Sequence, residues 1–480
     1  MTKPTNRCAA AASLALLLIS SSAAAQPEDG GNAAYYVSAD ATETGDGTRA
    51  RPFRTLAEAE LASIAGDTIY LLAGDRALDG AVVLKPGQRL LGLGPDGTVA
   101  TDPDLRVAIT NTTPPPGGVI VTLAAHSEVA GLHFLDLGNH AISGARTDYT
   151  GSHVHHITVS GNAAAHVEDE RGLVYAISLA AASGIRGEVR IEDSHFMDGE
   201  DLGAIRVFHS GNSRGRYLFQ RNAFADLGGR AYFVRTQHTS RADTIILDSE
   251  ARNIGRGNRN SDSIIPYLMG QSEQVMLIRN YQFSNPDREG NQSNTGIEAY
   301  MFGAPRPDQP NWCTGCRLTL KILDSVLEHA VTDPIQFSNS GRDSVLAYEI
   351  RNTQIIGGTP RQGGGGISLN LQPGPDSGGR TTLLVENTDV IGTDGYGFAL
   401  NDRGGGPHDL IVDLGGGVLG SRGHNRFVDN SKGPLRVAGH RVTARHNWWG
   451  GGVPVAHGPD DRVAPEAEVL TEPVLTEDPR

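Results

Sequence analysis

Four residues in the middle of the chain have side chains that could transfer a proton or hold an acidic group: His209, Arg235, Glu298 and Tyr300. A guanidinium pairs with a carboxylate in two-point geometry, so Arg235 could hold and neutralise a substrate carboxylate. Tyr300 is our preferred proton-transfer group. An unperturbed tyrosine has a pKa of about 10, so Tyr300 would need cationic neighbours such as Arg235 and Arg206 to act near neutral pH.

The spacing of apolar residues predicts that most of these groups lie on one outer face of a sheet. Six segments alternate as short strands, and the side chains expected to point inward are Ile205/Val207, Tyr232/Val234, Ile297/Ala299, Ile335/Phe337, Ile367/Leu369 and Phe398/Leu400. The residues expected to point outward are Arg206, Phe233, Arg235, Glu298, Tyr300, Gln336, Ser338, Ser368, Asn370 and Asn401. Parallel strands lie about 4.8 Å apart, so Arg235 and Tyr300, two strands apart, would be about 10 Å apart at the backbone.

Further polar residues near this face are candidates for substrate binding: Arg206, His238, Tyr267, Gln336, Asn370 and Asn401. We expect His209 and His238 just beyond the strand ends, and Tyr267 on the strand between those of Arg235 and Tyr300. A solvated polar face without function remains an alternative. The combination of Tyr, Arg, Glu and Gln favours hydrogen bonding and proton transfer over an idle surface.

The strands that must position these residues belong to a repeat. Each copy consists of an alternating strand, a polar pair, a short strand, a loop and a second alternating strand, and the pairs are Glu192-Asp193, Arg221-Asn222, Arg279-Asn280, Asp324-Ser325, Arg351-Asn352 and Glu386-Asn387. A repeat made only of strands predicts an all-β solenoid, a parallel β-helix of about ten to twelve coils from Thr68 to Gly450. Asparagine tolerates left-handed backbone and can stack in a ladder, so we expect corner positions at Asn222, Asn280, Asn352 and Asn387.

A short helix before the first coil is predicted to cover the end of the solenoid. Thr55 and Glu58 form a capping box, and the helix should run from Leu56 to Ala65 with Ala57, Leu61 and Ile64 on one face. A solenoid end exposes apolar core and unpaired strand edges, so such a cap is needed on physical grounds.

The two ends of the chain differ from the repeat region. Residues 1–25 combine Lys3 and Arg7, an apolar run and a small-residue site before Gln26, which predicts a signal peptide and export to the periplasm or medium. Residues 26–452 would form the solenoid, and residues 453–480, rich in Pro, Glu and Asp, an acidic tail. No later apolar run approaches the length of a membrane span.

The net charge of the chain limits the kinds of molecule that it could bind. The formal charge of −14, which becomes −16 without Lys3 and Arg7, argues against nucleic acid, while the arginine-rich segment 200–290 suits a substrate with uronic acids. We expect a monomer without a cofactor. Calcium binding remains an alternative, although the sequence shows no clear cluster of ligands for it.

Cys313 and Cys316 are expected to form a local disulfide in an exported protein, with free thiols or a metal site as alternatives.

The opening YYVSADATETGDGTRARPFRTLAEAELASIAGDTIYLLAG, the repeat pattern and Asn447-Trp448-Trp449-Gly450 together resemble the pectin-lyase-like right-handed parallel β-helix superfamily, over roughly residues 33–452. The resemblance implies a right-handed helix whose asparagine corner lies between the second and third strands of each coil. In members that act on polysaccharides, the substrate lies along the first strands. It implies a fold, and not one activity.

Catalytic motifs of known branches are incomplete here. The first-strand face carries one acid, Glu298, where calcium-dependent pectate lyases cluster aspartates, and the polygalacturonase set does not occur. Tyr396-Gly397-Phe398 and Pro407-His408-Asp409 are similar to parts of mannuronan C5-epimerase motifs.

We therefore expect a polysaccharide lyase acting on an acidic polysaccharide by β-elimination. The alternatives are a glycoside hydrolase, a uronate C5-epimerase, and a non-catalytic polysaccharide-binding or surface protein. A hydrolase needs two carboxyl groups about 5 to 10 Å apart, and Glu298 could pair with Asp262, Asp333 or Asp402 from flanking loops.

Overall fold

The computed structural model describes residues 32–112, 118–145, 147–161, 174–256, 261–286, 295–301, 312–339, 341–360, 363–371, 378–402, 408–451 and 468–479. Within these residues the strands form three parallel sheets, one of 15 strands and two of 12. From β2 to β38 the chain visits the three sheets in turn, and each strand pairs with the strand three positions later, as β16 pairs with β19 and β17 with β20. The end strands β1 and β39 pair with β2 and β38. The predicted right-handed parallel β-helix and its number of coils are confirmed.

Sheet I contains the strands predicted to carry the functional face. Its members are β4 (Val82–Val83), β7 (Val121–Thr122), β10 (Ile142–Ser143), β13 (Val174–Ala181), β16 (Leu202–His209), β19 (Tyr232–Thr236), β22 (Ile264–Leu268), β25 (Ile297–Met301), β28 (Ile335–Asn339), β31 (Gly365–Leu371), β34 (Tyr396–Asp402) and β37 (Gly433–Val437).

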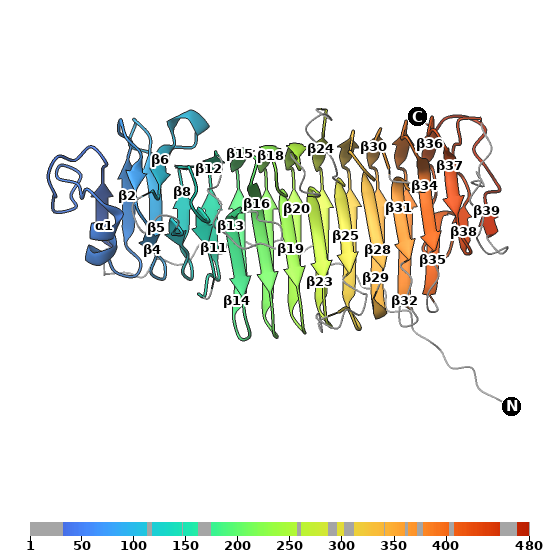
Figure 1. Ribbon diagram of the computed structural model, residues 1–480, viewed down its shortest axis with the longest axis horizontal. Coiled ribbons are helices and arrows are strands. Elements are labelled where there is room, and N and C mark those ends of the chain that lie inside the picture. Colours follow the sequence, from blue (N-terminus) through green and yellow to red (C-terminus); the bar gives the residue numbers. More distant parts are fainter. Residues whose placement is uncertain are drawn as a thin grey trace. The chain divides into compact units, whose positions relative to one another are not determined.

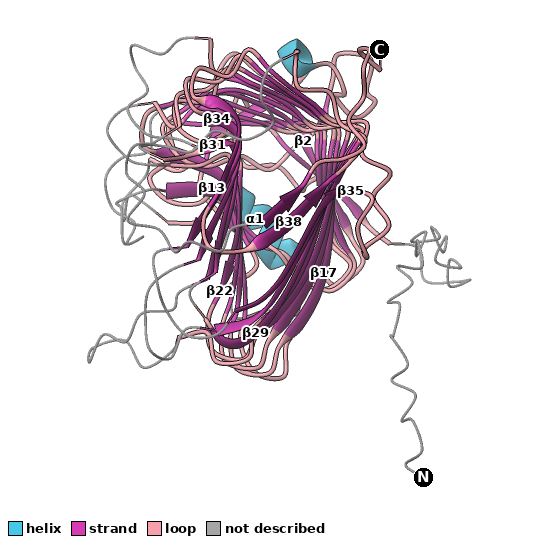
Figure 2. Cartoon of the chain, turned by 90° about the vertical axis from the view of Figure 1, so that its right-hand side faces the viewer, coloured by secondary structure: helices cyan, strands magenta, loops and turns pink. Residues whose placement is uncertain are grey.

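Sheet II follows sheet I within each coil. Its members are β1 (Ala34–Val37), β2 (Thr68–Leu72), β5 (Arg89–Leu93), β8 (Glu128–Ala130), β11 (Ser152–His155), β14 (Arg186–Glu192), β17 (Arg214–Gln220), β20 (Arg241–Leu247), β23 (Glu273–Arg279), β26 (Arg317–Leu323), β29 (Arg342–Arg351), β32 (Gly378–Glu386), β35 (His408–Gly415), β38 (Arg441–Ala444) and β39 (Glu468–Leu470). Figure 2 looks along the stack, with β13, β31 and β34 of sheet I on one side and β17 and β35 of sheet II on the other.

Sheet III completes each coil with shorter strands. Its members are β3 (Leu78–Asp79), β6 (Val107–Thr110), β9 (Leu132–Leu135), β12 (Thr158–Ser160), β15 (His195–Gly199), β18 (Ala223–Leu227), β21 (Glu250–Ile254), β24 (Gln282–Ser284), β27 (Val326–Glu328), β30 (Gln354–Ile356), β33 (Asp389–Ile391) and β36 (Arg426–Val428). The inward side chains of all three sheets form one continuous apolar core, in which rings stack between coils, as Phe196 does on Phe224 at 5.2 Å.

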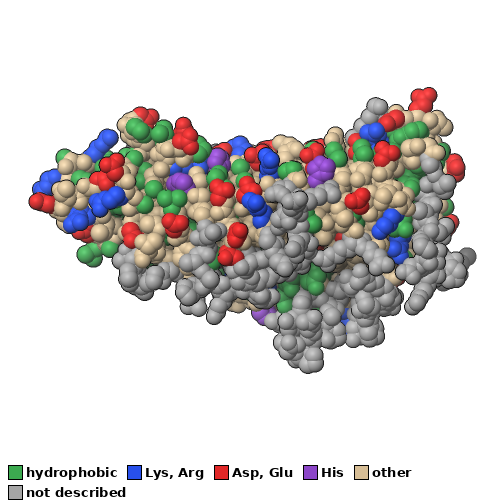
Figure 3. Space-filling view, turned by 45° about the horizontal axis from the view of Figure 1, so that its top comes forward, with side chains coloured by type: hydrophobic (Ala, Val, Ile, Leu, Met, Phe, Trp, Pro, Cys, Tyr) green, Lys and Arg blue, Asp and Glu red, His purple; other side chains and the backbone are tan. Residues whose placement is uncertain are grey.

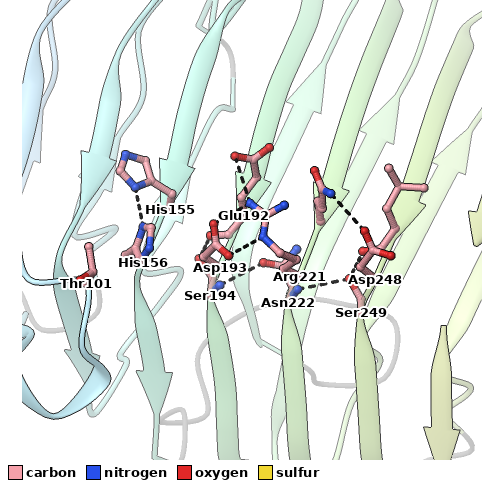
Figure 4. Close-up of polar contacts among 12 residues, drawn as sticks. Thr101, His155, His156, Glu192, Asp193, Ser194, Arg221, Asn222, Asp248 and Ser249 are labelled. Carbon is pink, nitrogen blue, oxygen red and sulfur yellow. Dashed lines mark hydrogen bonds and ion pairs between the residues drawn. The ribbon is translucent and has the colours of Figure 1, made fainter. Parts of the chain in front are cut away.

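The corner between sheets II and III is built on left-handed residues. Seven consecutive coils place a non-glycine residue with φ between 49° and 53° there: Asp193, Arg221, Asp248, Asn280, Asp324, Asn352 and Asn387. The corner prediction is right for three asparagines and wrong for Asn222, because Arg221 takes the left-handed position and Asn222 the buried one after it. Arg221 Nε and Nη2 donate to the Asp193 carboxylate at 2.7 and 2.8 Å. Figure 4 shows this pair, and Asn222 bonded to Ser194 and Ser249.

Helix α1 (Leu56–Ala62) packs against β1 and β4 at the first coils, and Figure 1 shows it beside β2. The capping box between Thr55 and Glu58 is present. The helix ends three residues earlier than predicted, and the predicted apolar face is wrong, because Leu56 and Ala59 are buried while Leu61 is 88% exposed. A single-turn 3₁₀ helix, η1, spans Pro103–Leu105.

The structure bears on one of the two predicted boundaries at the ends of the chain. The predicted signal peptide lies outside the described residues. In the predicted acidic tail, Glu468–Leu470 form β39, which pairs with β38 as the last strand of sheet II, so the sheet continues past residue 452. No helix among the described residues has the length and hydropathy that a membrane span requires.

The Cys313–Cys316 disulfide is present, as expected, and both cysteines are buried.

Candidate functional site

The outer face of sheet I carries two columns of side chains in register. One column runs through Phe208, Arg235, Tyr267, Tyr300, Ser338, Asn370 and Asn401, each residue pairing with the next. The other column contains the pairs Arg206 with Phe233, Phe233 with Ile265, Glu298 with Gln336, and Gln336 with Ser368. Alternation therefore placed the outward residues correctly. Tyr267, on the strand between, also faces outward and separates Arg235 from Tyr300.

The half of this face from β13 to β25 is aromatic. Tyr175, Phe233 and Ile265 form a buried apolar cluster outside the main core, and Tyr267 and Tyr300 pack against it. Tyr267 and Tyr300 are stacked, with ring centroids 5.3 Å apart, and Tyr267 meets Phe233 edge to face at 6.0 Å. Stacked rings on an outer sheet face offer flat apolar surface of the kind a sugar ring can cover.

Arginines lie over these rings. The Arg235 guanidinium is 5.3 Å from the Phe208 ring and 5.5 Å from the Tyr267 ring. Arg206 lies 5.7 Å from Phe208, and Arg230 lies 4.6 Å from Phe233. A planar guanidinium that stacks on a ring keeps its N–H groups in its own plane, where they can still reach a carboxylate.

Three members of this cluster, Tyr175, Phe208 and Arg230, are not among the residues that the sequence singles out. Phe208 follows Arg206 by two residues and could have been found by the same alternation. Arg230 precedes its strand, and it donates to the Tyr175 hydroxyl at 2.9 Å. Because that contact joins residues 55 positions apart, no local pattern indicates it.

The half from β25 to β34 is polar and hydrogen-bonded. Gln336 Nε2 donates to Glu298 Oε1 at 2.6 Å, and Asn401 Nδ2 donates to Asn370 Oδ1 at 3.0 Å. Ser368 Oγ donates to Oδ1 of the buried Asp333 at 2.5 Å. Two carboxylates, Glu298 and Asp333, thus approach the same stretch of the column.

His209 does not lie on this face. It is the last residue of β16, its side chain points into the core, and it is 0% exposed. Its Nε2 is 2.5 Å from the Tyr217 hydroxyl and its Nδ1 is 2.9 Å from Ser213 Oγ. Burial lowers the pKa of His209 to about 4. The expectation of an accessible histidine beyond the strand end is wrong, because β16 continues through residue 209 and alternation turns that residue inward.

The remaining predicted groups lie at the margins of the face. His238 is exposed in the turn after β19, where its Nδ1 accepts the Gly211 N–H at 3.2 Å. Asp262 accepts the Thr295 N–H at 2.9 Å, and Asp402 lies 2.8 Å from His440. Among the described residues, no group of three or more His, Cys, Asp or Glu side chains is arranged to hold a metal ion.

No protein-family model and no curated protein matches this chain. Solved structures do. The chain is similar to the catalytic domain of a GH87 α-1,3-glucanase in complex with tetrasaccharides, at 13% identity and a TM-score of 0.44, over 93% of this chain and 70% of that one. It is also similar to the A-module of the Azotobacter vinelandii mannuronan C-5 epimerase AlgE4, at 13% identity and a TM-score of 0.31, over 84% of this chain and 100% of that one.

A third similar structure is the GH136 lacto-N-biosidase from Eubacterium ramulus, at 12% identity and a TM-score of 0.26, over 79% of this chain and 68% of that one. At this identity and these TM-scores the likeness concerns the fold, and it assigns no activity to the chain.

Proposed function

We propose that the chain is a carbohydrate-active enzyme that uses the outer face of sheet I, and that it cleaves a uronate-containing polysaccharide by β-elimination. The observation that carries the proposal is the continuous column of Arg235, Tyr267 and Tyr300, in which a guanidinium and a phenol lie two strands apart on one face. Tyr267 lies between them as a platform for the sugar ring.

In this mechanism Arg235 binds the uronate carboxylate and stabilises the negative charge that develops on it. Tyr300, as the phenolate, takes the proton from C5. The electron pair of the broken C–H bond forms a C4–C5 double bond, and the bond from C4 to the glycosidic oxygen breaks. The departing oxygen takes a proton from water. His209 has no part in these steps because it is buried in the core.

The test is to incubate the purified protein with acidic and neutral polysaccharides while recording ultraviolet absorbance and reducing ends in parallel. β-Elimination produces an unsaturated sugar that absorbs, together with a new reducing end. New absorbance on a uronate polymer supports the proposal. Reducing ends without absorbance, or no product from any polymer, would refute the lyase mechanism.

A glycoside hydrolase is the second candidate, and the arrangement of Glu298 and Asp333 favours it. Glu298 is bonded to Gln336, and Asp333 is bonded to Ser368 on the next strand of the same column. Gln336 and Ser368 pair in register on neighbouring strands, about 4.8 Å apart, so the two carboxylates are bonded to adjacent residues of one column. A hydrolase uses two carboxyl groups about 5 to 10 Å apart. Reducing ends without absorbance, abolished by Glu298→Gln and Asp333→Asn alike, would support this candidate.

We further propose that the protein is exported after removal of residues 1–25 and acts as a monomer. Mass spectrometry of the protein recovered outside the cytoplasm should give an N-terminus at Gln26. Light scattering should give the mass of one chain. An N-terminus at Met1 would contradict the removal of residues 1–25. The mass of a dimer would contradict the monomer.

A further inference from the structure

A hollow lies on the outer face of sheet III, on a different side of each coil from the column on sheet I. Its lining includes Ala223, Ala225, Glu250, Arg252, Ser284 and Glu328. These residues come from β18, β21, β24 and β27, four neighbouring strands. In Figure 1 strands of sheet III lie along the upper edge, and Figure 3, in which that edge comes forward, shows acidic and basic side chains interspersed on this side.

The floor of the hollow contains small side chains, and its strands are paired in register above buried aromatic rings. Ala225 pairs with Arg252, Arg252 with Ser284, and Ser284 with Glu328, so small and charged residues alternate along one column. Beneath the floor, Phe224 and Phe283 are buried in the core. Small outward side chains let a flat molecule approach the sheet, and the packed rings below fix the positions of the charged groups around it.

The charged residues of the hollow differ from those on the neighbouring sheet of the same coils. On sheet II, Arg241 is 2.9 Å from Asp243 and 3.0 Å from Glu273, so these charges neutralise one another. Within the described part of the chain, the side chains of Glu250, Arg252 and Glu328 make no hydrogen bond or ion pair. Their hydrogen-bonding capacity is available to a ligand.

We propose that this hollow is a non-catalytic binding site for a neutral saccharide. Arg252 and Glu328 lie two strands apart, about 10 Å at the backbone, which leaves room for a sugar ring over Ser284. A sugar hydroxyl both accepts and donates, so one ring can accept from the Arg252 guanidinium and donate to the Glu328 carboxylate. Two carboxylates against one guanidinium disfavour an acidic sugar. The proposal does not depend on the activity of sheet I.

The test is calorimetric titration of the full-length mature protein with cellohexaose, xylohexaose and mannohexaose, and with hexagalacturonate as the acidic probe. Saturable binding of at least one neutral probe is expected. Ala225→Trp should weaken it at least tenfold by filling the floor, and Glu328→Gln should weaken it several-fold without a change in size. Ala225 is partly exposed and points outward, so both variants should keep the thermal unfolding temperature of the parent.

Two matched variants separate this site from other surfaces. Gln282 lies in the hollow, and Gln354 lies two strands further along the same column, outside it. Gln282→Ala should weaken binding of the neutral probe while Gln354→Ala leaves it unchanged. Tyr300→Phe on sheet I should also leave this binding unchanged, so a failure of the lyase proposal is recognised separately.

Absence of saturable binding by all three neutral probes would overturn the proposal. So would binding that survives both Ala225→Trp and Glu328→Gln, because the ligand would then lie elsewhere. Binding of hexagalacturonate that is tighter than that of every neutral probe, and that Ala225→Trp weakens, would overturn the assignment of a neutral ligand to the hollow.

Discussion

The outer faces of sheets I and II have the same strand spacing and differ in what their charged side chains contact. On sheet II, charges pair across neighbouring coils: Lys321 lies 2.6 Å from Glu349, and Arg351 lies 2.6 Å from Glu386. On sheet I, Arg206 and Arg235 lie over aromatic rings. On sheet II the paired charges hold neighbouring coils together, whereas on sheet I the guanidinium planes stack on rings, and Arg235 Nη2 also donates to Met269 Sδ at 3.3 Å. Side-chain type, and not backbone, thus separates the face that we propose to bind substrate from the face whose charges are paired.

The largest effect is expected from Tyr300→Phe, which removes only the hydroxyl that we assign to proton transfer. Turnover on the uronate substrate should fall by about 10² to 10⁴, the usual contribution of a general acid or base, with little change in substrate affinity. Initial rates followed by ultraviolet absorbance measure this. Tyr70→Phe is the matched control, because Tyr70 is stacked on Tyr36 at 5.1 Å on the outer face of sheet II. Equal rates for both variants and the parent would remove sheet I as the catalytic face.

Arg235→Ala should reduce turnover and weaken substrate binding together, because we propose that the guanidinium holds the carboxylate before and during the reaction. Arg351→Ala on sheet II should leave both unchanged, since that arginine is bonded to Glu349 at 2.6 Å and paired with Glu386. Steady-state kinetics across substrate concentrations measures kcat and KM separately. An Arg351 variant as impaired as the Arg235 variant would end the distinction between the two faces.

The ion pairs of sheet II should matter for stability alone. Glu386→Gln removes the charge that Arg351 and Arg422 share, and these arginines hold the pKa of Glu386 below its usual value. We expect the free energy of unfolding to fall by about 1 to 3 kcal/mol, with unchanged activity on folded protein. Denaturant unfolding measures the loss. A stability equal to that of the parent would show that this pairing is not what joins the coils.

Acid should destabilise the fold through groups away from sheet I's outer face. His209 has its pKa lowered by burial to about 4, below the unfolded value of 6.5, so stability is lost as pH falls from 6.5 toward 4. Glu192, bonded to His153 and Arg190, has its pKa lowered to about 2, so its contribution is lost below pH 4.5. Thermal unfolding across pH 7 to 3 measures both, and His209→Gln should flatten the decline between pH 6.5 and 4. A decline in that window identical to the parent's would contradict the assignment.

The smallest effect is expected from replacing Cys313 and Cys316 together by serine. The bond closes a ring of only a few residues, so its contribution in the chain-entropy model is about 2 kcal/mol, and the unfolding temperature should shift by about 4 °C or less. Thiol titration of the denatured, unreduced parent should find neither cysteine free. Loss of the whole fold in the double variant would show that the loop organises the coils.

Much of the fold and of the outer column follows from short-range pattern. The period of two along each strand places Arg235, Glu298 and Tyr300 outward, because successive side chains of a strand point to opposite faces whatever surrounds them. The polar corner pairs mark where each coil bends, because few residues adopt left-handed backbone at low cost. Both properties are local, because each depends only on a residue and its immediate neighbours in the chain.

The wrong predictions concern the end of a strand, the position of a corner, or which side chains of a helix are buried. The sequence places His209 beyond a strand that in fact extends through it, and it assigns to Asn222 the corner that Arg221 occupies. It also takes the face with Ala57, Leu61 and Ile64 as the apolar face of the helix, and Leu61 is exposed. The contact of Arg230 with Tyr175 and the pairing of β39 with β38 join distant segments.

What the sequence by itself determined is therefore the solenoid, its sheets and the direction in which each strand residue points. Only the tertiary structure decided which residues meet across coils, which charges pair and which remain available, and which face of α1 is covered. The physical reason is that side-chain direction depends on the local backbone, whereas pairing and burial depend on segments some thirty or more residues away, as in the bond between Asp333 and Ser368 across 35 positions.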